Sequence, residues 1–134
     1  MAEIPVRQPI KRVLVIDDEP DIRLVIQGSL EEVAGWTVIT ATSGKDGLIK
    51  LVSESPDAIL LDMMMPEMDG VSFLKVLRGY MADEKRTIPV LILTAKANVS
   101  PVVYELGAAG VIAKPFDPFL LPQQIAHYLG WNTH

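Results

Sequence analysis

The sequence contains no cysteine, and only two of its 134 residues are histidine. Without cysteine the chain can form neither a disulfide nor a thiolate metal site. No apolar run approaches the ~18 residues that a membrane-spanning helix needs, and the first residues lack the basic-then-apolar shape of a signal peptide. Lys and Arg number 12 against 17 Asp and Glu, which disfavours a nucleic-acid surface. We therefore expect a soluble cytoplasmic protein with no direct contact to nucleic acid or membrane.

The length and the hydrophobic fraction are those of one ordinary domain. A chain of 134 residues that is 49% hydrophobic can bury a sizeable core. We predict a flexible leader over residues 1–10, a single domain over 11–130 and a tail over 131–134. Because the sequence ends soon after its last predicted helix, we favour a stand-alone protein over a piece of a longer one.

Five short apolar runs alternate with amphipathic segments. Such runs, bounded by turn residues, are typical of strands buried on both faces, whereas the more alternating run 36–41 fits an edge strand. Strict alternation with helices predicts a parallel sheet. The fold class is therefore α/β, a doubly wound five-stranded parallel sheet with five helices. The predicted strands are 12–16, 36–41, 58–62, 89–93 and 111–113, and the helices start near Pro20, Ser43, Asp69, Ser100 and Pro122.

The ends of the helices carry recognisable signals. Ser43, with Asp46 three residues later, resembles a capping arrangement, and Asp69 is expected to cap the third helix. Gly35 suits the end of the first helix. A mid-helix proline would clash with the preceding turn, so the last helix should start near Pro122.

Polar residues of complementary chemistry follow four of the apolar runs. In a parallel sheet the carboxyl ends of the strands share one edge, and ligands of open α/β sheets bind there. Each residue taken alone has an ordinary structural explanation, whereas the set predicts a site. Its members are Asp17 and Asp18, Asp62, Thr94, and Lys114.

The chemistry of this set points to a metal and a phosphoryl group. Carboxylates that lie close together repel each other, and a hard cation such as Mg²⁺ relieves that repulsion. Lys114 adds a second positive charge and Thr94 a hydroxyl donor, and both suit phosphoryl oxygens. An aspartate can attack phosphorus to form an acyl phosphate. The residues alone therefore suggest Mg²⁺-dependent phosphorylation of an aspartate.

Together these motifs resemble the receiver domain of bacterial response regulators, over roughly residues 11–129. The resemblance implies a flavodoxin-like fold of the CheY type, with strand order 2-1-3-4-5. The motifs that carry it are Asp17-Asp18-Glu19, Asp62 with Pro66 four residues later, Met68-Asp69-Gly70, Thr94-Ala95 and Lys114-Pro115-Phe116.

The resemblance also implies a place for the metal. Asp62 would be the phosphoryl acceptor and, together with Asp18, a direct ligand of Mg²⁺. The backbone carbonyl of Met64 would be a third ligand, and Asp17 would hold the metal through water.

Other residues would contact the phosphoryl group. By the same resemblance, Thr94 would donate a hydrogen bond to one phosphoryl oxygen, Lys114 would pair with another, and small Ala95 would leave room for the group. The bond between Lys114 and Pro115 is expected to be cis.

The implied function is a signalling switch and not an enzyme with a substrate pool. A sensor histidine kinase or phosphotransfer protein would supply the phosphoryl group, and the domain would catalyse only its own phosphorylation and dephosphorylation. The face formed by the fourth helix, fifth strand and fifth helix would change and engage a downstream protein. The sequence names neither the kinase nor the target.

Some features depart from the family pattern. Val111 stands where many receivers carry an aromatic residue, and the fourth helix is short, so we expect movement of the loop after Thr94 in place of a ring flip. Met64 cannot orient water well, which predicts slow self-hydrolysis, and Lys96 could reach the phosphoryl oxygens.

Three other functions remain as alternatives. A pseudo-receiver that binds partners without phosphorylation would not need this intact set of residues. A phosphatase of the haloacid dehalogenase type would need a second aspartate where Met64 stands. A flavodoxin-type cofactor binder would need a Ser/Thr/Gly-rich loop after the first strand, where the chain has Asp17-Asp18-Glu19-Pro20.

Overall fold

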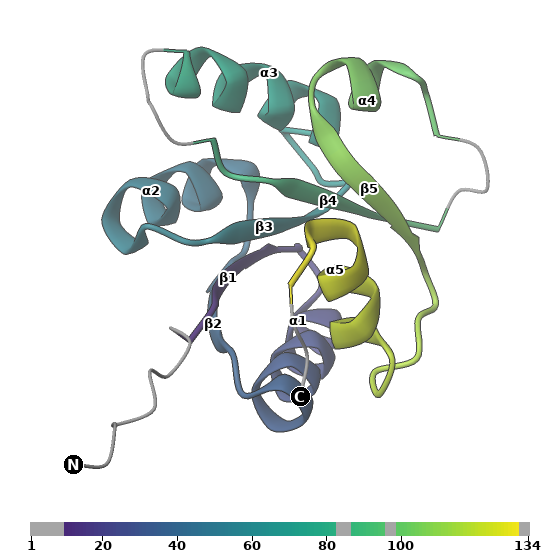
Figure 1. The fold of residues 1–134 in the computed structure, drawn as a ribbon. Coiled ribbons are helices and arrows are strands. Elements are labelled where there is room, and N and C mark those ends of the chain that lie inside the picture. The colour runs from purple at the N-terminus through teal and green to yellow at the C-terminus, as the bar shows by residue number, and fades with distance from the viewer. Residues whose placement is uncertain (1–9, 83–86, 96–98, 132–134) are drawn as a thin grey trace.

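The computed structural model describes residues 10–82, 87–95 and 99–131. Within this part of the chain, five parallel strands form one sheet in the order β2-β1-β3-β4-β5 (Figure 1). This is the predicted fold class and strand order. The strands are β1 (Arg12–Ile16), β2 (Thr37–Ala41), β3 (Ala58–Asp62), β4 (Val90–Thr94) and β5 (Ala108–Ala113).

Helices cover both faces of the sheet (Figure 1). One face carries α1 and α5 and the other carries α2, α3 and α4. The helices are α1 (Pro20–Gly28), which continues into the π-helical turn η1 (Ser29–Val33), α2 (Gly44–Glu54), α3 (Gly70–Met81), α4 (Val102–Glu105) and α5 (Leu121–Leu129). None of the helices in the described ranges is long and apolar enough to cross a membrane.

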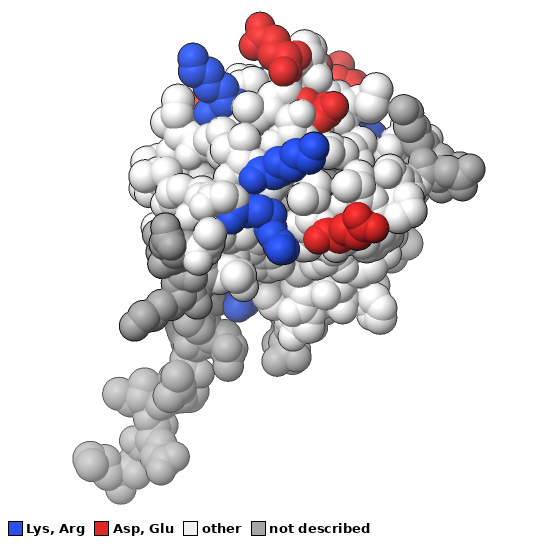
Figure 2. Space-filling model, turned by 90° about the horizontal axis from the view of Figure 1, so that it is seen from above, with Lys and Arg blue, Asp and Glu red and all other residues white. Residues whose placement is uncertain are grey.

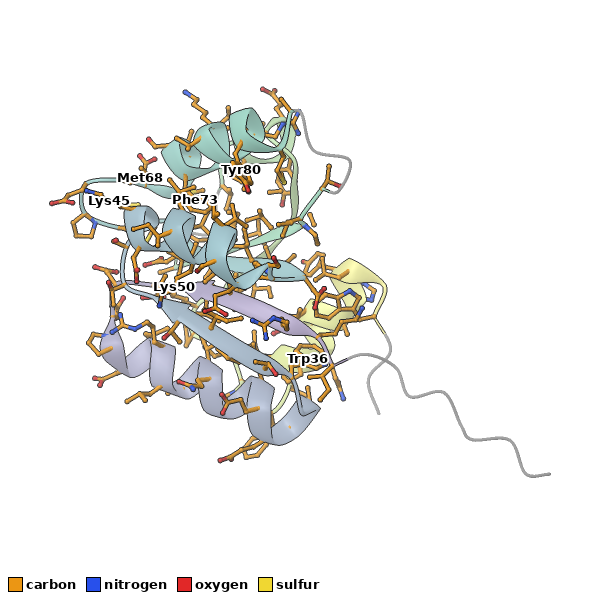
Figure 3. The ribbon with its side chains drawn as sticks, turned by 90° about the vertical axis from the view of Figure 1, so that its left-hand side faces the viewer. Trp36, Lys45, Lys50, Met68, Phe73 and Tyr80 are labelled. Carbon is orange, nitrogen blue, oxygen red and sulfur yellow. The ribbon has the colours of Figure 1, made fainter. Side chains whose placement is uncertain are left out.

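The core consists of two apolar layers, one on each side of the sheet. Alternate residues of β1 point to opposite faces, so Leu14 joins the layer under α2 and α3, whereas Val15 joins the layer under α1 and α5. Phe73 of α3 lies in the first layer and is fully buried (Figure 3). The three central strands are buried on both faces, which explains their continuous apolar sequences.

The predicted helix ends are confirmed where the structure shows the caps. Ser43 Oγ accepts a hydrogen bond from the Asp46 N–H at 3.1 Å, and Asp69 Oδ1 accepts one from the Ser72 N–H at 2.8 Å. Gly35 adopts a φ of 72° just after the π-helical turn, a conformation that costs glycine little. These local signals therefore fix where the chain enters and leaves its helices.

The fifth strand is longer than the sequence suggested. It begins at Ala108, three residues before the predicted start at Val111. The residues Ala108, Ala109 and Gly110 lack the β-branched character that marks a strand. A register shift between Val90 and Leu91 leaves an extra residue on β5. Pairing with β4 therefore overrides the weak local preference of this segment.

The end of the chain packs further than the predicted boundary at residue 130. Trp131, which we had placed in the tail, packs edge-on against Trp36 with ring centroids 5.2 Å apart. Lys11 Nζ lies 4.9 Å from the centre of the Trp131 ring. Figure 3 shows Trp36 near the start of β2. The limits 11–130 stay a prediction, and residues 1–9 and 132–134 lie outside the described residues.

Candidate functional site

The register of the sheet brings the predicted site residues to one edge. Ile16 at the end of β1 pairs with Leu61 of β3, so Asp17 and Asp62 follow side by side. Asp62 in turn pairs with Leu93, the residue before Thr94. The three strands thus deliver two carboxylates and a hydroxyl to neighbouring positions, as the parallel topology predicted.

Four acidic side chains meet at this edge. Asp17, Asp18, Glu19 and Asp62 each offer a carboxylate oxygen, and these atoms lie within 4.8 Å of one another. Asp17 is 0% exposed and Asp62 is 3% exposed. Two buried carboxylates beside two solvent-accessible ones are unfavourable unless cations compensate their charge.

Lys114 is the cation that the structure places among these acids. Its Nζ lies 3.0 Å from Asp17 Oδ2, 3.3 Å from Asp62 Oδ1 and 3.9 Å from Glu19 Oε1. Burial by itself would lower the pKa of Lys114, but the hydrogen bond and charge of Asp17, together with Asp62, raise the pKa above its ordinary value. Lys114 is therefore charged at neutral pH.

The surroundings of Asp62 favour its neutral form, whereas those of Lys114 favour its charged form. Burial raises the pKa of Asp62 above the usual value and the neighbouring Asp17 carboxylate raises it further, whereas Lys114 and the Met64 N–H act in the other direction. The Met64 N–H donates to Asp62 Oδ1 at 3.3 Å. The compensation for this carboxylate is thus incomplete in the protein alone.

The remaining predicted residues lie around Asp62. Thr94, at the end of β4, is 2% exposed, and its carbonyl accepts a hydrogen bond from the Lys114 N–H at 2.8 Å. The Met64 side chain is 58% exposed and, with Thr94, lines a hollow of about 290 Å³. Ala95 is exposed, and Lys96 lies outside the described residues.

One expectation at the edge of the site is met, because the peptide bond between Lys114 and Pro115 is cis. Nearby, Met65 is buried in the core, where its thioether packs among apolar side chains.

Sequence reasoning missed two members of the site. Glu19 is largely exposed to solvent, and its carboxylate nevertheless lies within the acidic cluster. Arg23, one turn into α1, donates from Nη1 to the backbone carbonyl of Asp17 at 2.7 Å. The helical spacing from Glu19 to Arg23 was readable, but it gives no sign that the side chain turns back to the strand end.

Comparison with known proteins agrees with this geometry. The sequence model described as the response regulator receiver domain matches residues 13–126. The chain belongs to the response regulator receiver domain family. It is thus a receiver domain of two-component signalling, a family of signalling proteins and not of metabolic enzymes.

Individual relatives extend the comparison. The chain is 43% identical over 110 residues to the alkaline phosphatase synthesis transcriptional regulatory protein PhoP of Bacillus subtilis, covering 81% of this chain and 44% of that protein. It is 40% identical over 112 residues to the transcriptional regulatory protein KdpE of Mycobacterium tuberculosis, covering 81% and 47%. This receiver domain therefore spans about half the length of the curated relatives it matches.

Solved structures support the same fold. The chemotaxis protein CheY4 of Vibrio cholerae superposes with a TM-score of 0.78 at 31% identity, covering 90% of this chain and 99% of that one. The receiver domain of Francisella response regulator 1452 gives a TM-score of 0.76 at 30% identity, covering 90% and 97%. The fold of this receiver domain is thus shared with solved chains that it covers almost completely.

The donor set of the acidic cluster fits a hard divalent cation. All of its side-chain ligands are carboxylate oxygens, the donors that Mg²⁺ prefers, and neither sulfur nor imidazole takes part. A dication would also supply the positive charge that the partly compensated Asp62 lacks.

Proposed function

We propose that this receiver domain accepts a phosphoryl group on Asp62 in a Mg²⁺-dependent reaction and thereby switches its surface. One observation carries the proposal. The Lys114 ammonium lies 3.3 Å from the nearly buried Asp62 carboxylate, beside three further acids. A carboxylate in this setting is a nucleophile with a cation already beside it.

The proposed chemistry is a direct transfer to the carboxylate. An Asp62 oxygen attacks phosphorus and forms the acyl phosphate bond while the bond from phosphorus to the donor breaks. The donor leaves with the bonding electron pair and takes a proton from solvent. Lys114 pairs with one phosphoryl oxygen and Thr94 donates its hydroxyl to another, so that both offset charge on the transferred group.

The metal would lie among the carboxylates. Asp18, Asp62 and the Met64 carbonyl would hold it directly, and Asp17 would hold it through water. When bound, Mg²⁺ would offset negative charge on the phosphoryl oxygens. Asp17 binds Lys114 and the Glu19 N–H with its two carboxylate oxygens, which suits an indirect part in metal binding.

The partners follow from this chemistry. We infer that a sensor histidine kinase or phosphotransfer protein supplies the phosphoryl group in the cytoplasm, and that the face formed by α4, β5 and α5 engages a downstream protein. With a net charge of −5, we do not expect these 134 residues to contact nucleic acid. Figure 2 shows both basic and acidic side chains on a largely uncharged face of the molecule, seen from the side of α3 and α4.

Intact mass spectrometry tests the proposal. We would incubate the wild type and Asp62→Asn with a small acyl phosphate donor, with Mg²⁺ and with a chelator. A single phosphoryl adduct on the wild type that needs Mg²⁺ and is absent from the variant is the expected result. A folded wild type that gains no adduct would instead indicate a pseudo-receiver.

A further inference from the structure

Arg23 holds the loop between β1 and α1 from the helix side. Its backbone N–H donates to the Glu19 carbonyl at 3.1 Å, the first hydrogen bond of α1. Its side chain turns back to the end of the strand, where Nη1 donates to the Asp17 carbonyl at 2.7 Å. One residue therefore joins the start of the helix to the end of the strand, across the loop that carries three of the four clustered acids.

The contact completes the hydrogen bonding of a buried residue. Asp17 donates its N–H to the Ala41 carbonyl at 3.2 Å. Its Oδ1 accepts from the Glu19 N–H at 2.9 Å and its Oδ2 accepts from Lys114 at 3.0 Å. The carbonyl is the remaining polar group, and Arg23 satisfies it. A buried carbonyl that is left without a hydrogen-bond partner destabilises the local structure.

The direction of this carbonyl affects the next residue. The peptide unit between Asp17 and Asp18 is planar. A fixed direction of the Asp17 carbonyl therefore also fixes the directions of the Asp18 N–H and of the bond to the Asp18 Cα. Asp18 contributes one of the four clustered carboxylates. The N-cap residue Glu19 makes no side-chain capping bond, so a cap does not restrain the loop in place of Arg23.

We propose that Arg23 is a positioning residue of the divalent-cation site, acting through the Asp17 carbonyl to aim the Asp18 carboxylate at Asp62. The inference rests on the proposed function, because it assigns Arg23 to the metal site described there. The role is positional and not catalytic, since the contact of Arg23 is with a backbone oxygen. Side chains that orient metal ligands typically change metal affinity 10- to 100-fold when they are lost.

Lys50 provides a matched control. It lies on α2, and its Nζ donates to the Thr40 carbonyl of β2 at 3.0 Å, between that helix and the strand (Figure 3). Like Arg23, it is a helix cation bound to a carbonyl near the end of a strand. It differs because Thr40 is not next to an acid of the cluster. Loss of Lys50 should therefore reproduce any general effect on folding without the effect on the metal.

The test measures Mg²⁺ dissociation constants by isothermal titration calorimetry on the full chain, with urea unfolding of each variant. We expect Arg23→Gln to weaken Mg²⁺ binding about 10-fold. Lys50→Gln should stay within about two-fold of wild type, the level expected without a role at the metal. Arg23→Lys keeps one donor and should recover most of the affinity. The ratio of variant to wild-type constants should be the same at low and high salt, since a local hydrogen bond is little screened.

An unchanged Mg²⁺ dissociation constant in Arg23→Gln would overturn the inference, and so would an equal loss of Mg²⁺ affinity in Lys50→Gln. A ratio of the Arg23→Gln to the wild-type dissociation constant that falls to one at high salt would also overturn it, because it would indicate a long-range charge effect. If Arg23→Gln does not fold, NMR of the wild type decides: the Arg23 side-chain and Asp18 amide signals should shift together as Mg²⁺ saturates, and an unmoved Arg23 would refute the role. A wild type that binds no Mg²⁺ would defeat the proposed function as well.

Discussion

Asp62 is a carboxylate whose burial works against its own ionised form. Its pKa in the folded protein is raised above the unfolded value of 3.8. The folded state therefore binds this proton more tightly, and the ionised group lowers stability as the pH rises through its folded pKa. Without divalent cations, Asp62→Asn should raise the free energy of unfolding at pH 7 by on the order of 1 kcal/mol, an ordinary size for a point mutation. Urea unfolding with a chelator measures this.

The stability gained through Asp62→Asn should shrink as the pH falls toward the unfolded pKa of Asp62. The wild-type carboxyl then becomes protonated, so that wild type and variant are both neutral at this position. Asp69→Asn is the matched control. Asp69 accepts the Ser72 N–H, and that hydrogen bond lowers its pKa, so its charge favours folding above the unfolded pKa. Neutralising Asp69 should therefore not stabilise the protein. A less stable Asp62→Asn variant at pH 7 would contradict the argument.

Met64 should slow the loss of the phosphoryl group. Its side chain is exposed beside Asp62, and a thioether is a weak acceptor that orients water poorly. We expect Met64→Asn to shorten the lifetime of the acyl phosphate several-fold, while Met64→Leu leaves it close to wild type. The decay of the phosphorylated mass over time measures both. An unchanged lifetime in Met64→Asn would count against this assignment.

Alanine substitutions at two glycines, one in β5 and one in α3, should have opposite effects on the stability of the fold. At Gly110 of β5, an added Cβ would clash with the Tyr128 ring of α5, whose hydroxyl donates to the Val111 carbonyl at 3.1 Å. At Gly79 of α3, an added Cβ meets nothing within 4 Å. Thus Gly110→Ala should lower stability by about 1–3 kcal/mol, whereas Gly79→Ala should raise it by about 0.5–1 kcal/mol. Thermal unfolding of both variants tests the pair, and a neutral Gly110→Ala would show that the ring moves freely.

The switch should centre on the segment that follows Thr94. The α4 helix has four residues, and Val111 offers no ring that could rotate inward. We therefore expect amide NMR shifts on phosphorylation to concentrate between Ala95 and Gly107 and at the start of β5. Residues 96–98 lie outside the described residues. Shifts confined to distant elements would argue against a loop-driven switch.

Sequence patterns predicted these elements well where one local cause dominates. Continuous apolar runs marked β1, β3 and β4, and the side chains of Ser43 and Asp69 marked the starts of α2 and α3. The early part of β5 was missed because small residues carry little strand preference, and their pairing depends on β4. Arg23 was missed for a related reason, since the reach of its side chain depends on the tertiary approach of α1 to β1.

The site was predictable to a similar extent. The parallel order puts strand ends on one edge, so the meeting of Asp17, Asp62 and Lys114 follows from topology. Distances and burial do not follow from it. That Lys114 contacts both acids, and that Glu19 joins them, depends on side-chain packing at the end of β5 and on the first turn of α1.

At the scale of the whole molecule, metal binding should stabilise the fold. A ligand that binds only the native state adds about 2.7 kcal/mol at 100 times its dissociation constant. We therefore expect saturating Mg²⁺ to raise the unfolding temperature, and Asp62→Asn or Asp18→Asn to reduce the effect. Potassium chloride at equal ionic strength is the control. An equal rise with potassium would indicate screening of the net charge of −5 and not a metal site.

The central claim is that Asp62, among four clustered acids, is the one that receives the phosphoryl group. Treating the phosphorylated protein with hydroxylamine converts an acyl phosphate to a hydroxamate, and peptide mass spectrometry then locates it. We predict one hydroxamate, on the peptide that contains Asp62, only in samples phosphorylated with Mg²⁺ present. A hydroxamate on Asp17, Asp18 or Glu19 instead would contradict the account.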